Sequence, residues 1–188
     1  MDLHLNGKSV LVTGGTRGIG LASAKAFAGE GASVTIAGST QASADQARLA
    51  LRGEGIDVQA LCADLSQPEG REALAERLRS VDILVNNAGA IPGLTALSDA
   101  QWRSAWELKV HGYIETTRLA LPEMMARGAG VIVNVIGIAA EMPRYDYLCG
   151  AVGNAALSTF TRAVGAHATT RGVRVLGVNP GPTETDRL

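Results

Sequence analysis

A glycine-rich stretch, Thr13–Gly20, has the residue types and spacing of a phosphate-binding loop. It follows an apolar run, Ser9–Val12, that predicts a buried strand, and a helix is expected to begin at Ile19. Glycine lets the backbone turn sharply, and the missing Cβ lets main-chain N–H groups approach a diphosphate at the positive end of the helix. A plain turn is the alternative. The flanking strand and helix favour a dinucleotide site.

Strand and helix patterns alternate along the chain with few residues between them, which is typical of a parallel sheet covered by helices. Right-handed crossovers and a reversal after the first strand place ligands at the carboxyl ends of the strands. We expect an α/β fold, a Rossmann-type doubly wound parallel sheet in three layers (α/β/α), with strand order 3-2-1-4-5-6. The later strands are expected at Ser33–Ala37, Val58–Cys62, Ile83–Asn86, Gly130–Val135 and Arg174–Val178, and the later helices at Ser43–Arg52, Glu69–Arg79, Asp99–Arg127 and Leu148–Thr170.

The composition predicts a globular protein that binds neither nucleic acid nor a membrane. The chain has 188 residues, 46% hydrophobic and 19% charged, with a net charge of −1 and no Lys/Arg block. This length fits a single domain, residues 1–188. Without a signal peptide or a membrane-spanning run, the protein is expected to be cytoplasmic. Cys62 and Cys149 lack metal-ligand spacing and are interpreted as reduced, small apolar residues, so no metal is expected.

Four motifs, in order, resemble those of the short-chain dehydrogenase/reductase family, and the match runs from residue 8 to residue 185. The resemblance implies an NAD(P)-dependent oxidoreductase that moves a hydride between its cofactor and a small-molecule carbonyl or alcohol substrate. It also implies a homodimer or homotetramer. The motifs are the TGxxxGxG loop at Thr13–Gly20, an acidic adenine contact at Asp64-Leu65, the NNAG turn at Asn86–Gly89 and the PGxxxT segment at Pro180–Thr185.

The resemblance assigns cofactor contacts motif by motif. Asp64 would accept a hydrogen bond from the adenine amino group, or it could simply be solvated before a helix. The NNAG turn would bring the backbone close to the ribose, and an Asn amide there can tie neighbouring loops together. The threonines of the last motif would meet the nicotinamide carboxamide. The expected cofactor-binding residues are Gly14, Thr16, Arg17, Gly18, Ile19, Gly20, Ser39, Asp64, Leu65, Asn87, Ala88, Gly89, Pro180, Gly181, Thr183 and Thr185.

The end of the second strand favours NADP over NAD. A carboxylate there would bind the 2′-hydroxyl of NAD and repel the 2′-phosphate of NADP, and the sequence Ala37-Gly38-Ser39-Thr40 has no acid. Arg17 could pair with the phosphate, and Ser39 and Thr40 could donate hydrogen bonds to it. The alternative for Arg17 is a solvent-facing charge, and NAD stays possible.

The positions that carry proton transfer in the family are all substituted. The family uses a Ser, a Tyr-x-x-x-Lys pair and an Asn on the preceding long helix. Alignment on the flanking residues places Gly137 at the Ser position, Gly150 at the Tyr position, Asn154 at the Lys position and Lys109 at the Asn position.

Two of these substitutions exchange an amide and an amine between adjacent helices, so a cation is kept at the site. Tyr147 lies three residues before Gly150, on the same helical face one turn earlier. We hypothesise that Tyr147 is the proton donor, that Lys109 lowers its pKa through charge proximity, and that Asn154 orients ribose or water. The alternative is that Tyr147 and Tyr145 are packing residues at a helix start and Lys109 is a solvated charge.

Loss of the usual catalytic groups leaves a second function open, a dinucleotide-binding protein without turnover that acts as a sensor or as an inactive oligomer partner. A nucleotide-sugar epimerase or dehydratase is disfavoured because those relatives also need the Tyr-Lys pair. The family's last helices and strand, which shape the substrate pocket, are absent after residue 188, and the sixth strand's outer edge has no cover. We expect a truncated sequence or partner chains there, with 138–145 and 91–94 lining one side of the substrate site.

Subunit contacts are expected along the two long helices, whose small residues permit close approach, unless these residues simply pack on the sheet. Trp102 and Trp106, four apart on one helical face, predict core or subunit packing. The small residues are Ala155, Ala156, Ala163, Gly165 and Ala166.

Overall fold

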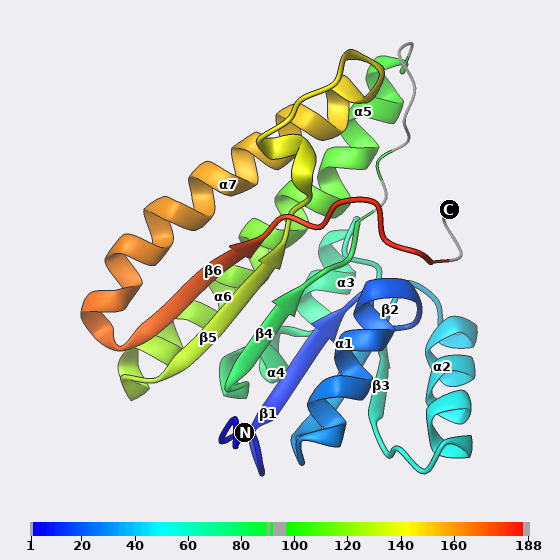
Figure 1. Ribbon diagram of the computed structural model, residues 1–188, viewed down its shortest axis with the longest axis vertical. Helices are drawn as coiled ribbons and strands as arrows, with labels where there is room; N and C mark the ends of the chain where they lie inside the picture. Colours follow the sequence, from blue (N-terminus) through cyan, green and yellow to red (C-terminus); the bar gives the residue numbers. More distant parts are fainter. Residues whose placement is uncertain (1, 90, 92–96, 186–188) are drawn as a thin grey trace.

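The computed structural model describes residues 2–89, 91 and 97–185. Its strands form one parallel sheet in the order β3-β2-β1-β4-β5-β6, which confirms the predicted topology. The direction of winding reverses between β1 and β4, and all strands point toward one edge (Figure 1). The strands are β1 (Ser9–Thr13), β2 (Ser33–Gly38), β3 (Gln59–Cys62), β4 (Ile83–Asn86), β5 (Gly130–Val135) and β6 (Val173–Val178).

β1 lies near the centre of the sheet. Its apolar run is buried because side chains pack against it on both faces. Val10, Leu11 and Val12 are at most 1% exposed. Val12 pairs with Ile36 of β2 and with Val85 of β4, so these three strands end at the same level. The loops that follow β1, β2 and β4 therefore open onto a common edge.

Helices cover the sheet from two sides (Figure 1). On one side α1 and α2 pack against β1 and β2, with Ala24 and Leu51 in the shared core. On the other side α4 and α6 contribute Leu78 and Met124, and α7 contributes Ala168. The helices are α1 (Gly18–Gly29), α2 (Gln41–Gly53), α3 (Pro68–Ala73), α4 (Ala75–Ser80), α5 (Asp99–Trp106), α6 (Gly112–Arg127) and α7 (Leu148–Ala168), with short turns η1 (Glu107–His111), η2 (Ile138–Ala140), η3 (Tyr145–Tyr147) and η4 (Thr169–Arg171).

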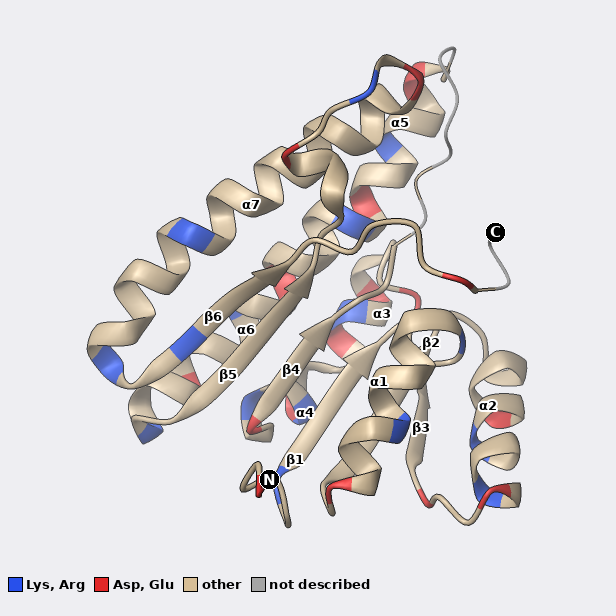
Figure 2. Cartoon of the chain, viewed as in Figure 1, with Lys and Arg blue, Asp and Glu red and all other residues tan. Residues whose placement is uncertain are grey.

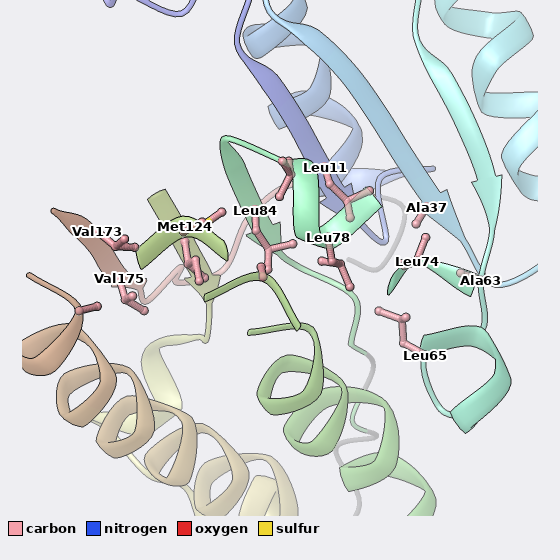
Figure 3. Close-up of a cluster of buried hydrophobic side chains, with 14 residues drawn as sticks. Leu11, Ala37, Ala63, Leu65, Leu74, Leu78, Leu84, Met124, Val173 and Val175 are labelled. Atoms are coloured by element: carbon pink, nitrogen blue, oxygen red, sulfur yellow. The ribbon is translucent and has the colours of Figure 1, made fainter. Parts of the chain in front are cut away.

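Figure 3 shows the core on the α4 and α6 side of the sheet. Leu11 of β1 and Leu84 of β4 lie in one cluster with Leu78 and Met124, and all four side chains are fully buried. Burying one such side chain is worth about 1.5–3 kcal/mol, and losing it would leave a cavity between strand and helix. This packing fixes the two strands whose carboxyl ends carry the glycine-rich loop and the NNAG turn.

Two helices predicted as continuous are interrupted. The helix expected at Glu69–Arg79 breaks at Leu74, which has φ −95° and ψ −5° and whose N–H bonds the carbonyl of Arg71 three residues back. The helix expected at Asp99–Arg127 contains a π-helical turn, η1, between α5 and α6. Such turns insert one extra residue and are frequent at functional sites.

The sheet is less covered at its β6 end. On β6, Leu176 and Val178 are 50% and 48% exposed, and no described helix lies over β6 on the side that α1 covers (Figure 1). Both cysteines are free thiols. Cys149 is buried, as a small apolar residue would be, whereas Cys62 is exposed at the end of β3. Among the described residues, no helix is long and apolar enough to cross a membrane.

Candidate active site

The glycines of the β1–α1 loop are needed chiefly for contacts within the protein. Gly14 and Gly18 have φ values of 61° and 53°, in the left-handed region. A Cβ on Gly14 would lie 2.8 Å from Cα of Ala88, and one on Gly20 would overlap the carbonyl oxygen of Gly14. At Gly14 and Gly20 contacts within the protein therefore require glycine as well, and the prediction that a Cβ would hold a diphosphate off the backbone stays a prediction. There glycine lets the NNAG turn and the first turn of α1 approach the loop.

Thr13 and Asn87 join the glycine-rich loop to the NNAG turn. The Asn87 side-chain Nδ2 donates to the carbonyls of Thr13 and Gly14, at 3.1 and 3.0 Å. The Thr13 Oγ1 accepts from the N–H groups of Asn87 and Ala88, at 3.0 and 3.1 Å. The Asn87 amide thus ties the two loops together, as the sequence analysis expected of an Asn in this motif.

Buried polar side chains fix the ends of the next two strands. Asn86 of β4 donates to Asn134 of β5 at 2.9 Å and accepts from Thr116 of α6 at 2.7 Å. Asn134 in turn donates to Thr161 of α7 at 2.8 Å. All four residues are at most 4% exposed. Because buried amides and hydroxyls are costly unless paired, this network holds two strands and two helices in one register beneath the site.

A cavity of about 740 Å³ lies over the carboxyl ends of the strands. The segment after β6 runs back across these ends (Figure 1) and closes one side. A Cβ on Gly18 would lie 3.5 Å from the Thr185 side chain, across the cavity from α1. The expected cofactor residues that line the cavity are Gly14, Thr16, Arg17, Gly18, Ile19, Ser39, Leu65, Asn87, Ala88, Gly89, Pro180, Gly181, Thr183 and Thr185, whereas Gly20 and Asp64 do not.

Arg17 at the start of α1 and Ser39 after β2 both line the cavity. Arg17 is exposed and forms the N-cap of α1, without a side-chain capping bond. The Thr40 hydroxyl accepts from the N–H of Ser43 and caps α2. Thr40 is not among the residues that line the cavity, although the NADP interpretation expected it to donate to the 2′-phosphate. Among the described lining residues Asp146 is the only carboxylate, and it pairs with Arg144 at 3.0 Å. The cavity wall near β2 is therefore free of acidic side chains.

Asp64, at the end of the β3 segment, caps its own turn. Its Oδ1 accepts from the N–H of Ser66 at 3.0 Å and from the Ser66 hydroxyl at 2.8 Å. Asp64 is half-buried and lies three residues before Gln67, the N-cap of α3, so its contact with adenine stays a prediction. Leu65, which follows it, lines the cavity.

In the same cavity, the ring of Tyr147 occupies the space above Gly150. A Cβ on Gly150 would overlap two ring carbons and would lie 2.6 Å from the Tyr147 hydroxyl oxygen. Tyr147 is half-buried and lines the cavity. Its ring packs on a cluster with Cys149 and Trp106, and the Trp106 Nε1 donates to the Cys149 carbonyl at 3.2 Å. The tryptophan pair is therefore core packing, and it supports the turn that carries Tyr147.

Lys109 lies beside the cavity wall rather than on it. Its aliphatic chain covers Gly89, where a Cβ would lie 2.9 Å from the Lys109 Cδ. Its Nζ donates to the carbonyl of Ile136 at 2.6 Å, at the end of the β5 segment, and lies 5.9 Å from the ring centre of Tyr113. Lys109 is absent from the cavity lining. Through this hydrogen bond, Lys109 contacts Ile136, which does line the cavity.

Asn154 is 2% exposed and lines the cavity, and its Oδ1 accepts no hydrogen bond from any described residue. Gly137, opposite, has a φ of 123°, and a Cβ there would lie 3.0 Å from the Asn154 Nδ2. The positive φ favours glycine, since other side chains are strained there. Glycine at 137 thus lets the backbone after β5 and the Asn154 amide approach each other closely.

Sequence reasoning missed several lining residues. Gly38, Ala63 and Leu108 carry no motif, and only their position at the ends of strands or on a neighbouring helix could have indicated them. The expectation for 138–145 and 91–94 agrees with Ile138, Ala139, Met142, Arg144 and Ile91, which line the cavity, while 92–94 lie outside the described residues.

The chain matches the family model described as short chain dehydrogenase over residues 8–188. It is 36% identical to D-beta-hydroxybutyrate dehydrogenase of Cupriavidus necator, over 94% of this chain and 71% of that protein. An uncharacterized oxidoreductase of Bacillus subtilis, YvrD, is 35% identical over 99% of this chain and 72% of its own. The structure of L-sorbose reductase from Gluconobacter frateurii, complexed with NADPH and L-sorbose, aligns with a TM-score of 0.90 at 34% identity, covering 100% of this chain and 74% of that one. The fold, the motifs and these matches agree: the chain belongs to the short-chain dehydrogenase/reductase family.

Proposed function

We propose that this protein is an NADP(H)-dependent oxidoreductase that interconverts a carbonyl compound and an alcohol. One observation carries the proposal. A single cavity runs from the glycine-rich loop at Gly14–Ile19 to Tyr147 and Asn154, so a nicotinamide dinucleotide seated on α1 would reach a proton donor. Its volume lies in the range of small-molecule sites, about 300–1,000 Å³.

The residues present fit the diphosphate and the 2′-phosphate of NADP. The N-terminus of α1 opens into the cavity, and its N–H groups and dipole favour an anion. Arg17 and Ser39 offer a cation and a hydroxyl at a wall without acidic side chains. The NADPH-bound L-sorbose reductase supports the same choice, and NAD stays the second candidate. Asp64 would contact adenine through its second carboxylate oxygen, since Oδ1 serves the turn.

Tyr147 is proposed to replace the acid/base tyrosine that the family has at the position of Gly150. When bound, the reduced cofactor supplies a hydride to the carbonyl carbon. Tyr147 donates its phenolic proton to the carbonyl oxygen as that C–H bond forms, and it takes the proton back when the alcohol is oxidised. The Lys109 ammonium stabilises the phenolate through its charge, and Asn154 orients the groups bound at this end of the cavity.

The alternative of a dinucleotide-binding protein without turnover gains no support from the comparisons, whose named members are oxidoreductases. Turnover decides between the two functions, because cofactor binding is common to both.

We also propose that the protein is located in the cytoplasm and forms a homodimer or homotetramer. The alanines Ala155, Ala156, Ala163 and Ala166 are exposed on α7 and do not pack on the sheet, whereas Gly165 approaches the carbonyl oxygen of Val175. Arg162 is the one Lys, Arg, Asp or Glu in α7, a helix almost bare of charge in Figure 2. Light scattering on the purified protein measures the oligomeric state.

The test of the function combines calorimetry with turnover. We expect NADPH to bind the wild-type protein and to be oxidised in a screen of ketones. Tyr147→Phe should reduce turnover at least a hundredfold, in line with the usual contribution of general acid catalysis, while the calorimetric affinity for NADPH stays within about twofold. Unchanged turnover in Tyr147→Phe would remove the relocated acid, and failure of both NADPH and NADH to bind would overturn the function itself.

A further inference from the structure

Buried residues follow Tyr147 directly in the chain, but exposed residues precede it. Residues 141–146 are all exposed, and Tyr147 itself is the N-cap of α7, where no side chain makes a capping hydrogen bond. The buried residues that follow are Cys149 and Gly150, in the first turn of α7. Because helix ends fray unless something holds them, the position of the phenol over Gly150 depends on how that first turn is fixed.

Trp106 holds the first turn of α7 through its indole N–H. Its Nε1 donates to the carbonyl of Cys149 at 3.2 Å. A helical carbonyl bonds to the N–H four residues later, and its second lone pair is left to accept from a side chain. The indole lies close to the helix there, since a Cβ on Gly153 would be 3.3 Å from Nε1. This hydrogen bond therefore joins the end of α5 to the backbone just after Tyr147.

Trp102 offers a comparison within the same helix. It lies one turn earlier in α5, is half-buried like Trp106, and packs against the same cluster. The centres of the two rings are 6.2 Å apart. The Trp102 indole donates no hydrogen bond to any described residue. The two tryptophans thus share their packing and differ in what the indole N–H does.

We propose that Trp106 is a positioning residue for the relocated acid: its N–H, bonded to the Cys149 carbonyl, keeps the Tyr147 phenol over Gly150 and in the cavity. This inference rests on the proposed function. Trp106 is absent from the cavity lining, so it acts on the backbone of α7 and not on a ligand. A reacting group misplaced by about 1 Å can lose about a hundredfold in rate, so a hydrogen bond outside the cavity can govern turnover.

Hydrogen exchange tests the structural half of the inference without turnover. Trp106→Phe removes the donor, and the amides of residues 151–154, the first that bond within α7, should exchange about tenfold faster because that turn opens more often. Trp102→Phe makes the same change one turn away and should keep these rates within about twofold of wild type. Equal rates in the two variants would overturn the inference.

A ring without its N–H separates the donor from the volume of the side chain. The chain has two tryptophans, so in the Trp102→Phe protein every tryptophan analogue is incorporated at position 106. Benzothienylalanine has sulfur in place of Nε1 and keeps the bicyclic ring. It should reproduce the faster exchange of Trp106→Phe, and it serves as the test if Trp106→Phe does not fold. Wild-type exchange with this analogue would show that the ring, and not its N–H, holds the turn.

Kinetics test the catalytic half. For the preferred ketone of the screen, Trp106→Phe should lower kcat about tenfold, with the KM and the calorimetric affinity for NADPH within about twofold of wild type. In a Tyr147→Phe background the same change should lower kcat less than about twofold, because both changes act through one hydroxyl. A purely structural role of Trp106 predicts the full tenfold loss in both backgrounds, and that result would overturn the inference.

The two measurements also separate this inference from the proposed function. Faster exchange in Trp106→Phe alone, in a protein that binds NADPH but oxidises it with no ketone, would support the placement of the turn by Trp106 and overturn the proposed function. Turnover that depends on Tyr147 but is equal in wild type and Trp106→Phe would support the proposed function and overturn this inference.

Discussion

At the residue scale, the site depends on how Tyr147 and Gly150 share one space. The spacing of three residues predicts a common helical face, but α7 begins only at Leu148, and Tyr147 belongs to the preceding turn, η3. Its ring lies over Gly150 because that turn folds back onto the helix, where the glycine leaves room. The sequence could indicate that the two residues are close. The Tyr147 ring fills the volume that a side chain at Gly150 would occupy. The geometry of the η3 turn places it there, and residue spacing alone does not predict that geometry.

Gly150→Ala tests this arrangement. The added Cβ would overlap the Tyr147 ring, so the phenol must move, and we expect kcat for the preferred ketone to fall at least tenfold while NADPH affinity changes little. Steady-state kinetics and calorimetry measure the two quantities. The effect should vanish in a Tyr147→Phe background, since both changes act through the same hydroxyl and such pairs are non-additive. An equal loss in both backgrounds would show that Gly150 acts on something other than the phenol.

At the scale of elements, the strands were predictable and the helix interruptions were not. Glycine follows the apolar run of β1, and asparagine follows that of β4. The sequence therefore predicts the end of each strand to within a residue or two. The break at Leu74 and the π turn at η1 are local changes in backbone hydrogen bonding, which the spacing of apolar residues does not reveal. Lys109 lies in that π turn, so its exact direction, toward the Ile136 carbonyl and not into the cavity, could not be read from the sequence.

Two of the three glycines of α1, Gly20 and Gly29, offer a matched pair for testing the glycine-rich loop. A Cβ on Gly20 would overlap the Gly14 carbonyl oxygen, whereas one on Gly29 meets nothing within 4 Å. Gly20→Ala should lower the free energy of unfolding by about 1–3 kcal/mol, as overpacking does, and weaken NADPH binding because the loop is displaced. Gly29→Ala should instead raise the free energy of unfolding by about 0.4–1 kcal/mol and leave binding unchanged. Urea unfolding and calorimetry measure both, and identical behaviour of the pair would contradict the loop geometry.

At the scale of the whole molecule, the amino-terminal end of the sheet is held by one carboxylate. The Oδ2 of Asp82 accepts from the N–H and the hydroxyl of Ser9, both at 2.9 Å, and so joins the start of β4 to the start of β1. Burial opposes the ionisation of Asp82, but the Ser9 hydrogen bonds and the charges of Lys8 and Arg127 outweigh it and lower its pKa below the ordinary 3.8. The charged form is therefore favoured by folding.

The lowered pKa gives this contact a definite pH dependence. Because the folded-state pKa is depressed, the stabilisation is fully present above the ordinary value of 3.8 and is lost as the pH falls through the folded-state pKa. Asp82→Asn removes the charge and keeps an acceptor, so it should lower the free energy of unfolding by about 1 kcal/mol near pH 7, with a smaller deficit near pH 3, below the ordinary pKa. Thermal unfolding at both pH values measures this, and Asp57→Asn, at an exposed aspartate after α2, is the control. A deficit of equal size at both pH values would mean that Asp82 acts through packing and not through its charge.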